Sequence, residues 1–376
     1  MIRHDEVTEQ PLLWPCCLDD LRLPNRVVMA PTTRARAVNE ALVPTDLHAA
    51  YYAQRASAGL IIAEGTWVSE RAIGFMCVPG MYSDAQVAAW SRVTGVVHAL
   101  GGHIAAQLWH AGANSHPDLR GGELPAGPSA VNPGEICRTP AGRTQTRTPR
   151  EMTTGDIDTV LADYAAAAAC ARRAGFDAVE IAANGTYLIA QFLNPRLNHR
   201  RDGYGTHRSR LLLEIVDAVA SAWDGQHVGV RLSPYWTASD RSGGPPAAGE
   251  YPYSADDQTL AGFDEVVAEL SQRQVAYLHL RGRAVSGAGP VPGEFARYRK
   301  IFGRTLIANH GFGRGSGNAI IGAGIADAVS FSRLFIANPD LVSRFALGHE
   351  LAASDPATHY AGGARGYLDY PVWPAA

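Results

Sequence analysis

Lysine is the scarcest charged residue of this 376-residue chain, with Lys300 as its only example. Charged residues make up only 18% of the sequence and the formal net charge is −3, so the chain has no excess of positive charge with which to bind a polyanion. Nucleic acid is therefore not an expected partner.

Long apolar runs are also missing. No stretch approaches the ~20 apolar residues that a helix needs to cross a bilayer. Residues 1–15 have neither the apolar core nor the small-residue cleavage site of a secretory signal. We expect a cytoplasmic protein that does not contact a membrane.

Cysteine is sparse and irregularly placed. The cysteines are Cys16, Cys17, Cys77, Cys137 and Cys170. An odd number without CxxC spacing argues against a disulfide framework or a zinc site, and the spacing of His103, His110 and His116 matches no ligand pattern, so we expect no metal. The sequence also lacks a Gly-x-Ser-x-Gly elbow, which disfavours nucleophilic hydrolysis.

Apolar residues, at 46%, fall in short runs that each precede a longer stretch with helical periodicity. The runs predict strands at Asn25–Ala30, Leu60–Glu64, His103–Leu108, Asp177–Ala182, His227–Leu232, Val275–Leu280, Thr305–Asn309 and Ala328–Phe331. Helices are predicted near 46–58, 84–100, 154–174, 208–223, 256–272, 294–302, 315–323 and 338–347. Strands that are apolar throughout are typical of a closed parallel barrel. We therefore predict an α/β fold, a TIM (β/α)8 barrel, with a doubly wound open sheet as the alternative.

A single domain over residues 1–376 is the simplest organisation, because no linker, shift of composition or internal repeat divides the chain. Two connections are too long and too rich in glycine and proline to be ordinary loops, at about 110–153 and about 233–255. Both follow the carboxyl ends of strands, where barrel active sites are built. We expect the first to cap the site and the second to form a mobile loop over it.

The polar residues at the predicted strand ends include no pair of acids and no lysine. This disfavours glycoside hydrolysis, Schiff-base chemistry and carboxylate-bound metals. Amide and hydroxyl donors together with Arg231 instead favour a site for a large polar ring with an anionic tail.

A glycine-rich segment, NHGFGRGSG at 309–317, lies between the seventh strand and the next helix. Its backbone N–H groups can approach an anion, and barrels commonly bind phosphate at the loops after strands seven and eight. Arg333 adds a cation there. A dinucleotide fingerprint is not supported, since Phe331 stands where an acid is needed. A tight turn without ligand is the alternative.

Several longer segments of the sequence resemble the old yellow enzyme family, and the resemblance covers nearly the full length of the chain. The segments are 25–34 (NRVVMAPTTR), 51–66 (YYAQRASAGLIIAEGT), 107–110 (QLWH), 228–234 (VGVRLSP), 335–341 (FIANPDL) and 366–371 (GYLDYP). The resemblance implies a TIM barrel that holds FMN noncovalently, takes electrons from NAD(P)H and passes hydride to an activated C=C bond.

The resemblance also implies which residues contact the cofactor. Thr33 matches the residue at the flavin C4 carbonyl, Gln107 the amide at the pyrimidine edge, and Arg231 the cation near N1 and the C2 carbonyl. The other matches surround the ring and the phosphate: Ala30, Pro31, Thr32, Gly65, Gly311, Phe312, Ser332 and Arg333. Without the resemblance, Arg231 is also compatible with a structural ion pair to Glu180 or Glu64.

Tyr187 matches the tyrosine that protonates the substrate carbon on the face opposite hydride delivery, although a tyrosine at a strand–helix junction is also compatible with a packing role. The family's His and Asn clamp for the substrate oxygen is missing, because Ala182 and Gly185 occupy those positions. Other side chains are therefore expected to contact substrate: Trp109, His110, Asn184, Tyr235 and Tyr360. Trp109 is equally compatible with a role as pocket wall.

These observations favour an FMN-dependent NAD(P)H oxidoreductase that reduces a C=C bond conjugated to a carbonyl in a specialised substrate, such as a biosynthetic one. A flavin-dependent desaturase or isomerase on the same scaffold and a flavin-binding protein without turnover are the alternatives. A small-molecule substrate is the expected partner, and the protein is expected to be a monomer or a homodimer.

Overall fold

A computed structural model describes residues 10–241, 251–283 and 289–373. Within them, parallel strands form a closed barrel in which each strand pairs with its neighbours in the chain and the last pairs with the first. The barrel strands are β3 (Val27–Met29), β4 (Leu60–Trp67), β5 (Ile104–Trp109), β10 (Ala178–Ala183), β11 (Val228–Leu232), β12 (Tyr277–Arg281), β13 (Thr305–Asn309) and β14 (Ala328–Phe331). All the predicted strands are present. The predicted TIM barrel is confirmed, and the open sheet is wrong.

The strands close because they are apolar on both faces, which suits burial between the barrel interior and the surrounding helices. At the amino-terminal end of the barrel, a hairpin of β1 (Cys16–Leu18) and β2 (Leu21–Leu23) packs on the interior. Leu18 and Leu23 join one apolar cluster with Leu60, Ile62 and Ile307. This end is therefore filled, and only the carboxyl ends of the strands are available for a site.

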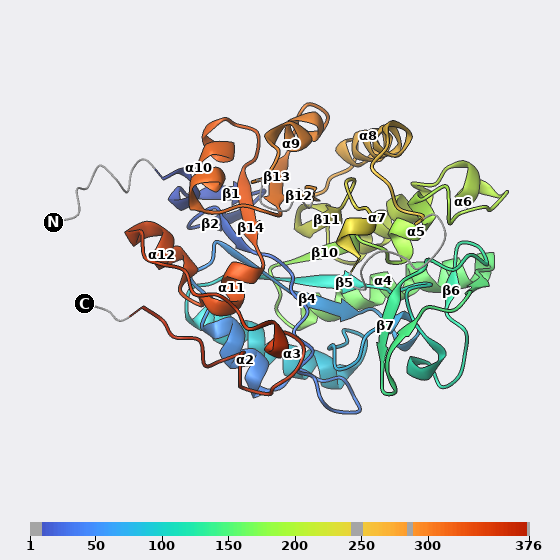
Figure 1. The fold of residues 1–376 in the computed structure, drawn as a ribbon, viewed down its shortest axis with the longest axis horizontal. Helices are drawn as coiled ribbons and strands as arrows, with labels where there is room; N and C mark the ends of the chain where they lie inside the picture. The colour runs from blue at the N-terminus through green and yellow to red at the C-terminus, as the bar shows by residue number, and fades with distance from the viewer. Residues whose placement is uncertain (1–9, 242–250, 284–288, 374–376) are drawn as a thin grey trace.

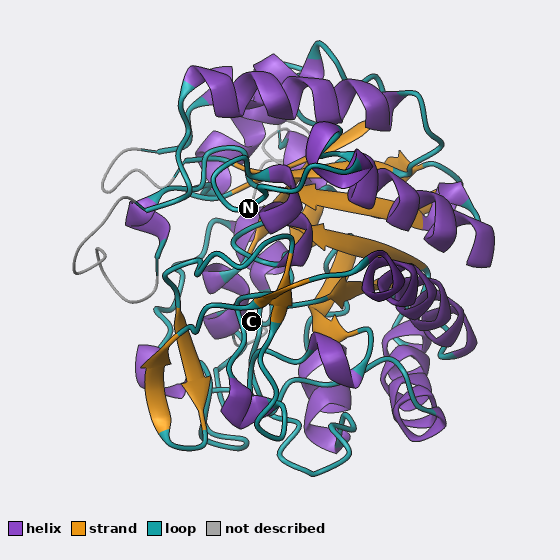
Figure 2. Ribbon diagram, turned by 90° about the vertical axis from the view of Figure 1, so that its right-hand side faces the viewer, coloured by secondary structure: helices purple, strands orange, loops and turns teal. Residues whose placement is uncertain are grey.

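Helices form the outer layer, as Figure 2 shows. They are α2 (Asp46–Ala53), α3 (Asp84–Ala99), α4 (Thr154–Arg173), α5 (Leu188–Leu193), α6 (Gly203–Thr206), α7 (Arg210–Ala222), α8 (Asp257–Ser271), α9 (Pro292–Arg299), α10 (Arg314–Gly322), α11 (Arg333–Ala337) and α12 (Leu341–Leu347). In Figure 1, α8, α9 and α10 lie along one side of the molecule and α2 and α3 along the opposite side. No helix in the described ranges is long and apolar enough to span a bilayer.

The helices α3 and α4 begin directly after residues whose side chains cap them. Ser83 caps α3 by accepting the N–H of Gln86, and Thr153 caps α4 by accepting that of Asp156. The last predicted helix, near 338–347, is present as α12, but it begins at Leu341, after α11 has ended at Ala337. Pro339 disfavours helical geometry at the residue before it, and Asn338 has φ −130° and ψ 82°.

The connection at 110–153 contains its own small elements. β7 (Ile136–Thr139) and β8 (Gly142–Gln145) form an antiparallel hairpin, while β6 (Ala126–Gly127) pairs with β9 (Arg150–Glu151). The hairpin stands at the opposite end of the molecule from α10 and α12 (Figure 1). Of the second long connection, residues 242–250 lie outside the described residues, and a short 3-10 turn, η5, spans Ala238–Asp240.

Two buried arginines that follow β3 bind the C-terminal segment to the barrel. Arg34 donates from Nε to the carbonyl of His359 (3.0 Å) and from Nη2 to that of Gly366 (2.7 Å). The guanidinium of Arg36 donates to further carbonyls of the same segment, those of Thr358, His359, Ala361, Gly363 and Arg365. Because the guanidinium charge is buried, these carbonyl oxygens accept the hydrogen bonds that water would otherwise accept.

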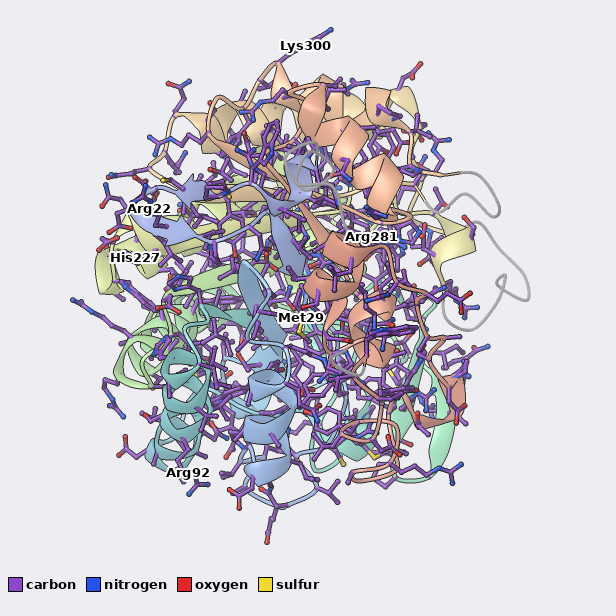
Figure 3. All side chains as sticks on the ribbon, turned by 90° about the vertical axis from the view of Figure 1, so that its left-hand side faces the viewer. Arg22, Met29, Arg92, His227, Arg281 and Lys300 are labelled. Atoms are coloured by element: carbon purple, nitrogen blue, oxygen red, sulfur yellow. The ribbon has the colours of Figure 1, made fainter. Side chains whose placement is uncertain are left out.

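We predict that Arg36→Ala lowers the free energy of unfolding by about 3 kcal/mol, because several buried carbonyls lose a charged donor together. Urea unfolding measures the change. Arg92→Ala is the matched control, since Arg92 projects from α3 into solvent (Figure 3) and its removal should change stability by less than about 0.5 kcal/mol. Equal stability of the two variants would contradict this account of the C-terminal segment.

Candidate active site

The carboxyl ends of the strands converge on one mouth, and the register fixes which residues lie at equal depth. Gln107 on β5 is opposite Glu180 on β10, and Arg231 on β11 is opposite His279 on β12. The pairing of β4 with β5 shifts between Ile62 and Gly65, a bulge of the kind often found beside active sites.

A chain of buried hydrogen bonds crosses the barrel just below this mouth. Gln107 Nε2 donates to Glu180 Oε1 (2.7 Å), Glu180 Oε2 lies 2.7 Å from His279 Nδ1, and His279 Nε2 lies 2.7 Å from Ser330 Oγ. Burial opposes ionisation of Glu180, but His279, Arg231 and Gln107 hold its pKa below the usual range. Burial lowers the pKa of His279. The carboxylate is therefore charged, and a neutral imidazole donates to it from Nδ1.

Arg231 lies in this layer without an ion pair. Its Nη2 donates to Asn309 Oδ1 (2.9 Å), and its Nε is buried with no hydrogen-bond partner in the described part of the chain. No acid in the described residues lies within ion-pair distance of its guanidinium. The structural ion pair with Glu180 or Glu64 is therefore not made, and one donor of Arg231 is left for a ligand.

The carboxyl ends of β3 and β14 lie together beside Arg231. Ala30 N–H donates to the carbonyl of Phe331 (3.0 Å), and the hydroxyls of Thr32 and Ser332 are 2.8 Å apart. Gly311 has φ 77°, a conformation that favours glycine. The structure thus gathers the predicted ring and phosphate residues on one rim: Ala30, Pro31, Thr32, Thr33, Gly311, Phe312, Ser332 and Arg333.

Aromatic rings form the other side of the mouth. Trp109 stacks on Trp67 with ring centroids 4.3 Å apart, and Tyr187 meets Trp109 edge to face at 4.7 Å. A Cβ at Gly65 would lie 2.5 Å from the Trp109 ring, so only glycine fits there. The indole Nε1 of Trp109 is buried without a partner in the described residues. These features leave a donor and a phenol beside each other.

At the end of β10 and in the loop that follows it, Ala182 and Gly185 offer no side-chain donor, as predicted, but an asparagine amide lies between them. Gly185, with φ 64°, donates its N–H to Ser233 Oγ (2.7 Å), and Ala182 is buried. Between them, Asn184 Oδ1 is buried and has no hydrogen-bond partner in the described ranges. An unsatisfied buried amide is costly unless a ligand or water meets it.

The remaining predicted substrate residues lie in different surroundings. His110 Nδ1 accepts the N–H of Gly112 (3.0 Å), and burial, with Arg120 nearby, lowers the His110 pKa to about 3. Tyr235 donates to the carbonyl of Glu294 (3.4 Å) on α9. Tyr360 is exposed. Its ring packs against Phe75 and against Arg138, which belongs to the β7–β8 hairpin.

Sequence reasoning considered Glu180 only as an ion-pair partner of Arg231 and assigned no role to His279, although both are in its predicted strands. The available signal was an acid and a histidine in otherwise apolar strands, which must find partners inside the barrel. The partner of each could not be read from the sequence, because Glu180 and His279 are 99 residues apart and meet only through strand register.

Glu64 is a second buried acid beside the mouth. Its Oε2 accepts the N–H groups of Arg34 (3.0 Å) and Ala35 (3.3 Å), the latter held at φ 53°. Its Oε1 lies 3.7 Å from His48 Nε2 and has no hydrogen bond in the described residues. Burial raises the pKa of Glu64 to about 7 and lowers that of His48 to about 4, so both are neutral near pH 6.

We predict that Glu64 contributes stability that is lost as pH rises from about 4.5 to about 7, because folded Glu64 retains a proton that the unfolded chain has released. The loss from this group is on the order of 2–4 kcal/mol. His48 acts in the opposite sense over part of this range, because its folded-state pKa is lowered, so the test is the difference between the two proteins. Urea unfolding between pH 5 and pH 8 should show the stability of the wild type falling relative to that of Glu64→Gln. Glu40→Gln, at an exposed acid, should keep the wild-type profile. Parallel profiles for all three proteins would exclude Glu64 as the cause.

Comparisons with known proteins agree with this geometry. A sequence profile of the NADH:flavin oxidoreductase / NADH oxidase family matches residues 11–352. Flavin oxidoreductase hxnT of Emericella nidulans is 37% identical, over 96% of this chain and 97% of its own. 12-Oxophytodienoate reductase 1 of Oryza sativa subsp. japonica is 36% identical, over 96% and 93%. The structure of morphinone reductase has a TM-score of 0.88 at 40% identity, covering 97% of each chain.

Barrel and mouth together define a flavin-dependent oxidoreductase. The chain belongs to the NADH:flavin oxidoreductase / NADH oxidase family, which is the old yellow enzyme family, and is an FMN-dependent NAD(P)H oxidoreductase. A related structure, morphinone reductase with tetrahydroNAD, has a TM-score of 0.86 and agrees with a nicotinamide reductant. The mouth itself fits FMN, because Arg231 Nε at the carboxyl end of β11 is a buried cationic donor without a partner in the described residues.

Proposed function

We propose that the protein reduces a C=C bond conjugated to a carbonyl, with electrons from NAD(P)H and a proton from Tyr187. Bound FMN supplies the hydride chemistry. The position of Tyr187 carries the proposal, since its ring contacts Trp109 at the mouth of the barrel. Burial, with Tyr360 and Glu135 nearby, raises the pKa of its phenol, so the hydroxyl keeps its proton at neutral pH.

The residues around the cofactor have separable roles in this proposal. Because Gln107 donates from Nε2 to Glu180, its amide is oriented with Oε1 as the free acceptor for the N–H of the pyrimidine edge. Arg231 would place positive charge beside the bound flavin, which would favour its reduction, and Thr33 would donate to a flavin carbonyl. Phosphate would be held by the rim after β13 and β14, through Gly311, Phe312, Ser332 and Arg333.

The substrate oxygen must be held without the side chains that Ala182 and Gly185 lack. Among the described residues, the indole N–H of Trp109 is a buried donor without a partner, and we assign it to the substrate oxygen. The unpartnered atom of Asn184 is Oδ1, which can only accept, so we assign it to a donor group of the substrate. Losing one well-aimed donor commonly costs ~10²–10³ in rate, so the replacement matters for turnover. Tyr235 already donates to another partner, whereas His110 accepts at Nδ1 and therefore carries its proton on Nε2.

Two substitutions should shift the midpoint potential of bound FMN in opposite directions. Arg231→Met removes positive charge and lowers the potential, whereas Glu180→Gln removes negative charge and raises it. We expect about 30 mV for each, which for a two-electron couple is ~1.4 kcal/mol. Anaerobic spectroelectrochemical titration measures both, with Glu40→Gln as the neutral control. Shifts of the same sign would show that these charges do not act on the flavin.

Tyr187→Phe should slow the reduction of an enone by the reduced enzyme by ~10² or more, because the carbon α to the carbonyl loses its proton donor. Reduction of the enzyme by NAD(P)H should be unchanged, which makes that half-reaction an internal control in stopped-flow experiments. If enone turnover is unaffected, the proton comes from another group, or the natural reaction is a desaturation or isomerisation that needs no proton from this face.

A further inference from the structure

A cavity of about 480 Å³ lies beside the mouth, outside the barrel. One wall is α8, whose residues Gln258, Gly262 and Glu269 recur on one helix face. The other wall is the chain from α5 to the start of α7, including Leu193 and Ser209. A volume of this size is in the range of small-molecule sites.

The lining of the cavity is apolar inside and polar at the rim. Leu193, Phe263 and Val266 contribute apolar surface, while His207 Nε2 and Glu269 Oε1 meet 2.6 Å apart at an exposed edge. An apolar wall that stays open to water is unfavourable unless a ligand covers it.

One polar group in this wall has no partner. Tyr253 is 8% exposed, and its hydroxyl has no hydrogen bond in the described part of the chain. Burial, with Tyr251, Glu135 and Tyr187 nearby, raises its pKa, so the hydroxyl is a donor. Tyr253 therefore lines the cavity and lies close to the proposed proton donor.

The cavity borders the active site at a position without a side chain. Gly185 lines the cavity together with Trp236. A Cβ at Gly185 would lie 3.2 Å from the Tyr187 ring and 3.9 Å from Trp236. Gly185 is therefore packed closely against the Tyr187 ring and also lines the cavity, so this one residue separates the phenol ring from the cavity.

We infer that this cavity is a second compartment of the substrate site, which takes an aliphatic or alicyclic arm bearing an oxygen acceptor for the Tyr253 hydroxyl. The inference rests on the proposed function for the position of the reacting end of the substrate. The substrate class is then a cyclic or open-chain enone with an apolar extension, rather than a small enone alone.

The test measures binding of unreactive ketones to the oxidised FMN holoenzyme by isothermal titration calorimetry. The probes are cyclohexanone and its 4-ethyl and 4-butyl derivatives. Burial of an arm predicts affinity that rises about fourfold per methylene. Gly262→Phe should abolish this rise and leave cyclohexanone binding unchanged, since the added ring fills the cavity. Nothing lies within 4 Å of a Cβ at Gly262, so the variant should fold.

Gly95→Phe is the matched control, because Gly95 is also a helical glycine with nothing within 4 Å of its Cβ but lies on α3. It should keep the rise of affinity with arm length. A second variant, Tyr253→Phe, should weaken binding of 4-(2-methoxyethyl)cyclohexanone by about five- to tenfold and leave the butyl probe unchanged. An unchanged ether affinity would remove Tyr253 from the inference.

Affinity independent of arm length in the wild type, no detectable binding of the series, or a rise that survives Gly262→Phe would overturn the compartment. These results are separate from the proposed function, because the probes are not reduced. A chain-length effect without reduction of any enone would support the cavity and refute the reductase proposal. Reduction of enones at rates independent of the arm would do the reverse.

Discussion

The ionised carboxylate of Glu180 inside the barrel is the constraint on which the mouth depends. A charge in such a place is tolerated only when its oxygens are hydrogen bonded. Gln107 and His279 provide those bonds, and Ser330 satisfies the far nitrogen of the imidazole. Side chains thereby join β5, β10, β12 and β14 in one layer of hydrogen bonds. The residues of the mouth directly above that layer therefore pack on a rigid support.

The barrel was predictable because its signal is local. Each strand is a short apolar run followed by a helical stretch, and closure follows from burial on both faces. The rim residues were also predictable, since Thr32, Gly65 and Arg231 stand where strands end. The cross-barrel partners were not, because Arg231 meets Asn309 across 78 residues and only strand register brings them together. Tyr235 illustrates the same limit, since its partner on α9 is 59 residues away.

Small residues shape the mouth as much as large ones do. Gly65 admits the Trp109 ring, which stacks on Trp67, and Gly185 allows the Tyr187 ring to pack closely against the backbone. At these positions glycine matters because it has no side-chain volume, and not only because its backbone is flexible. Substrate selection in this protein therefore depends on where side chains are missing, together with the buried donors that remain without partners.

The contacts of Arg34 and Arg36 set an order for the assembly of the protein. These residues follow the first barrel strand, but their partners lie in 358–366, more than 320 residues later. During synthesis, both guanidinium groups must wait for nearly the whole chain to emerge before they are satisfied. Contacts of such sequence separation form slowly. The C-terminal segment that carries Tyr360 is therefore among the last parts of the enzyme to dock onto the barrel.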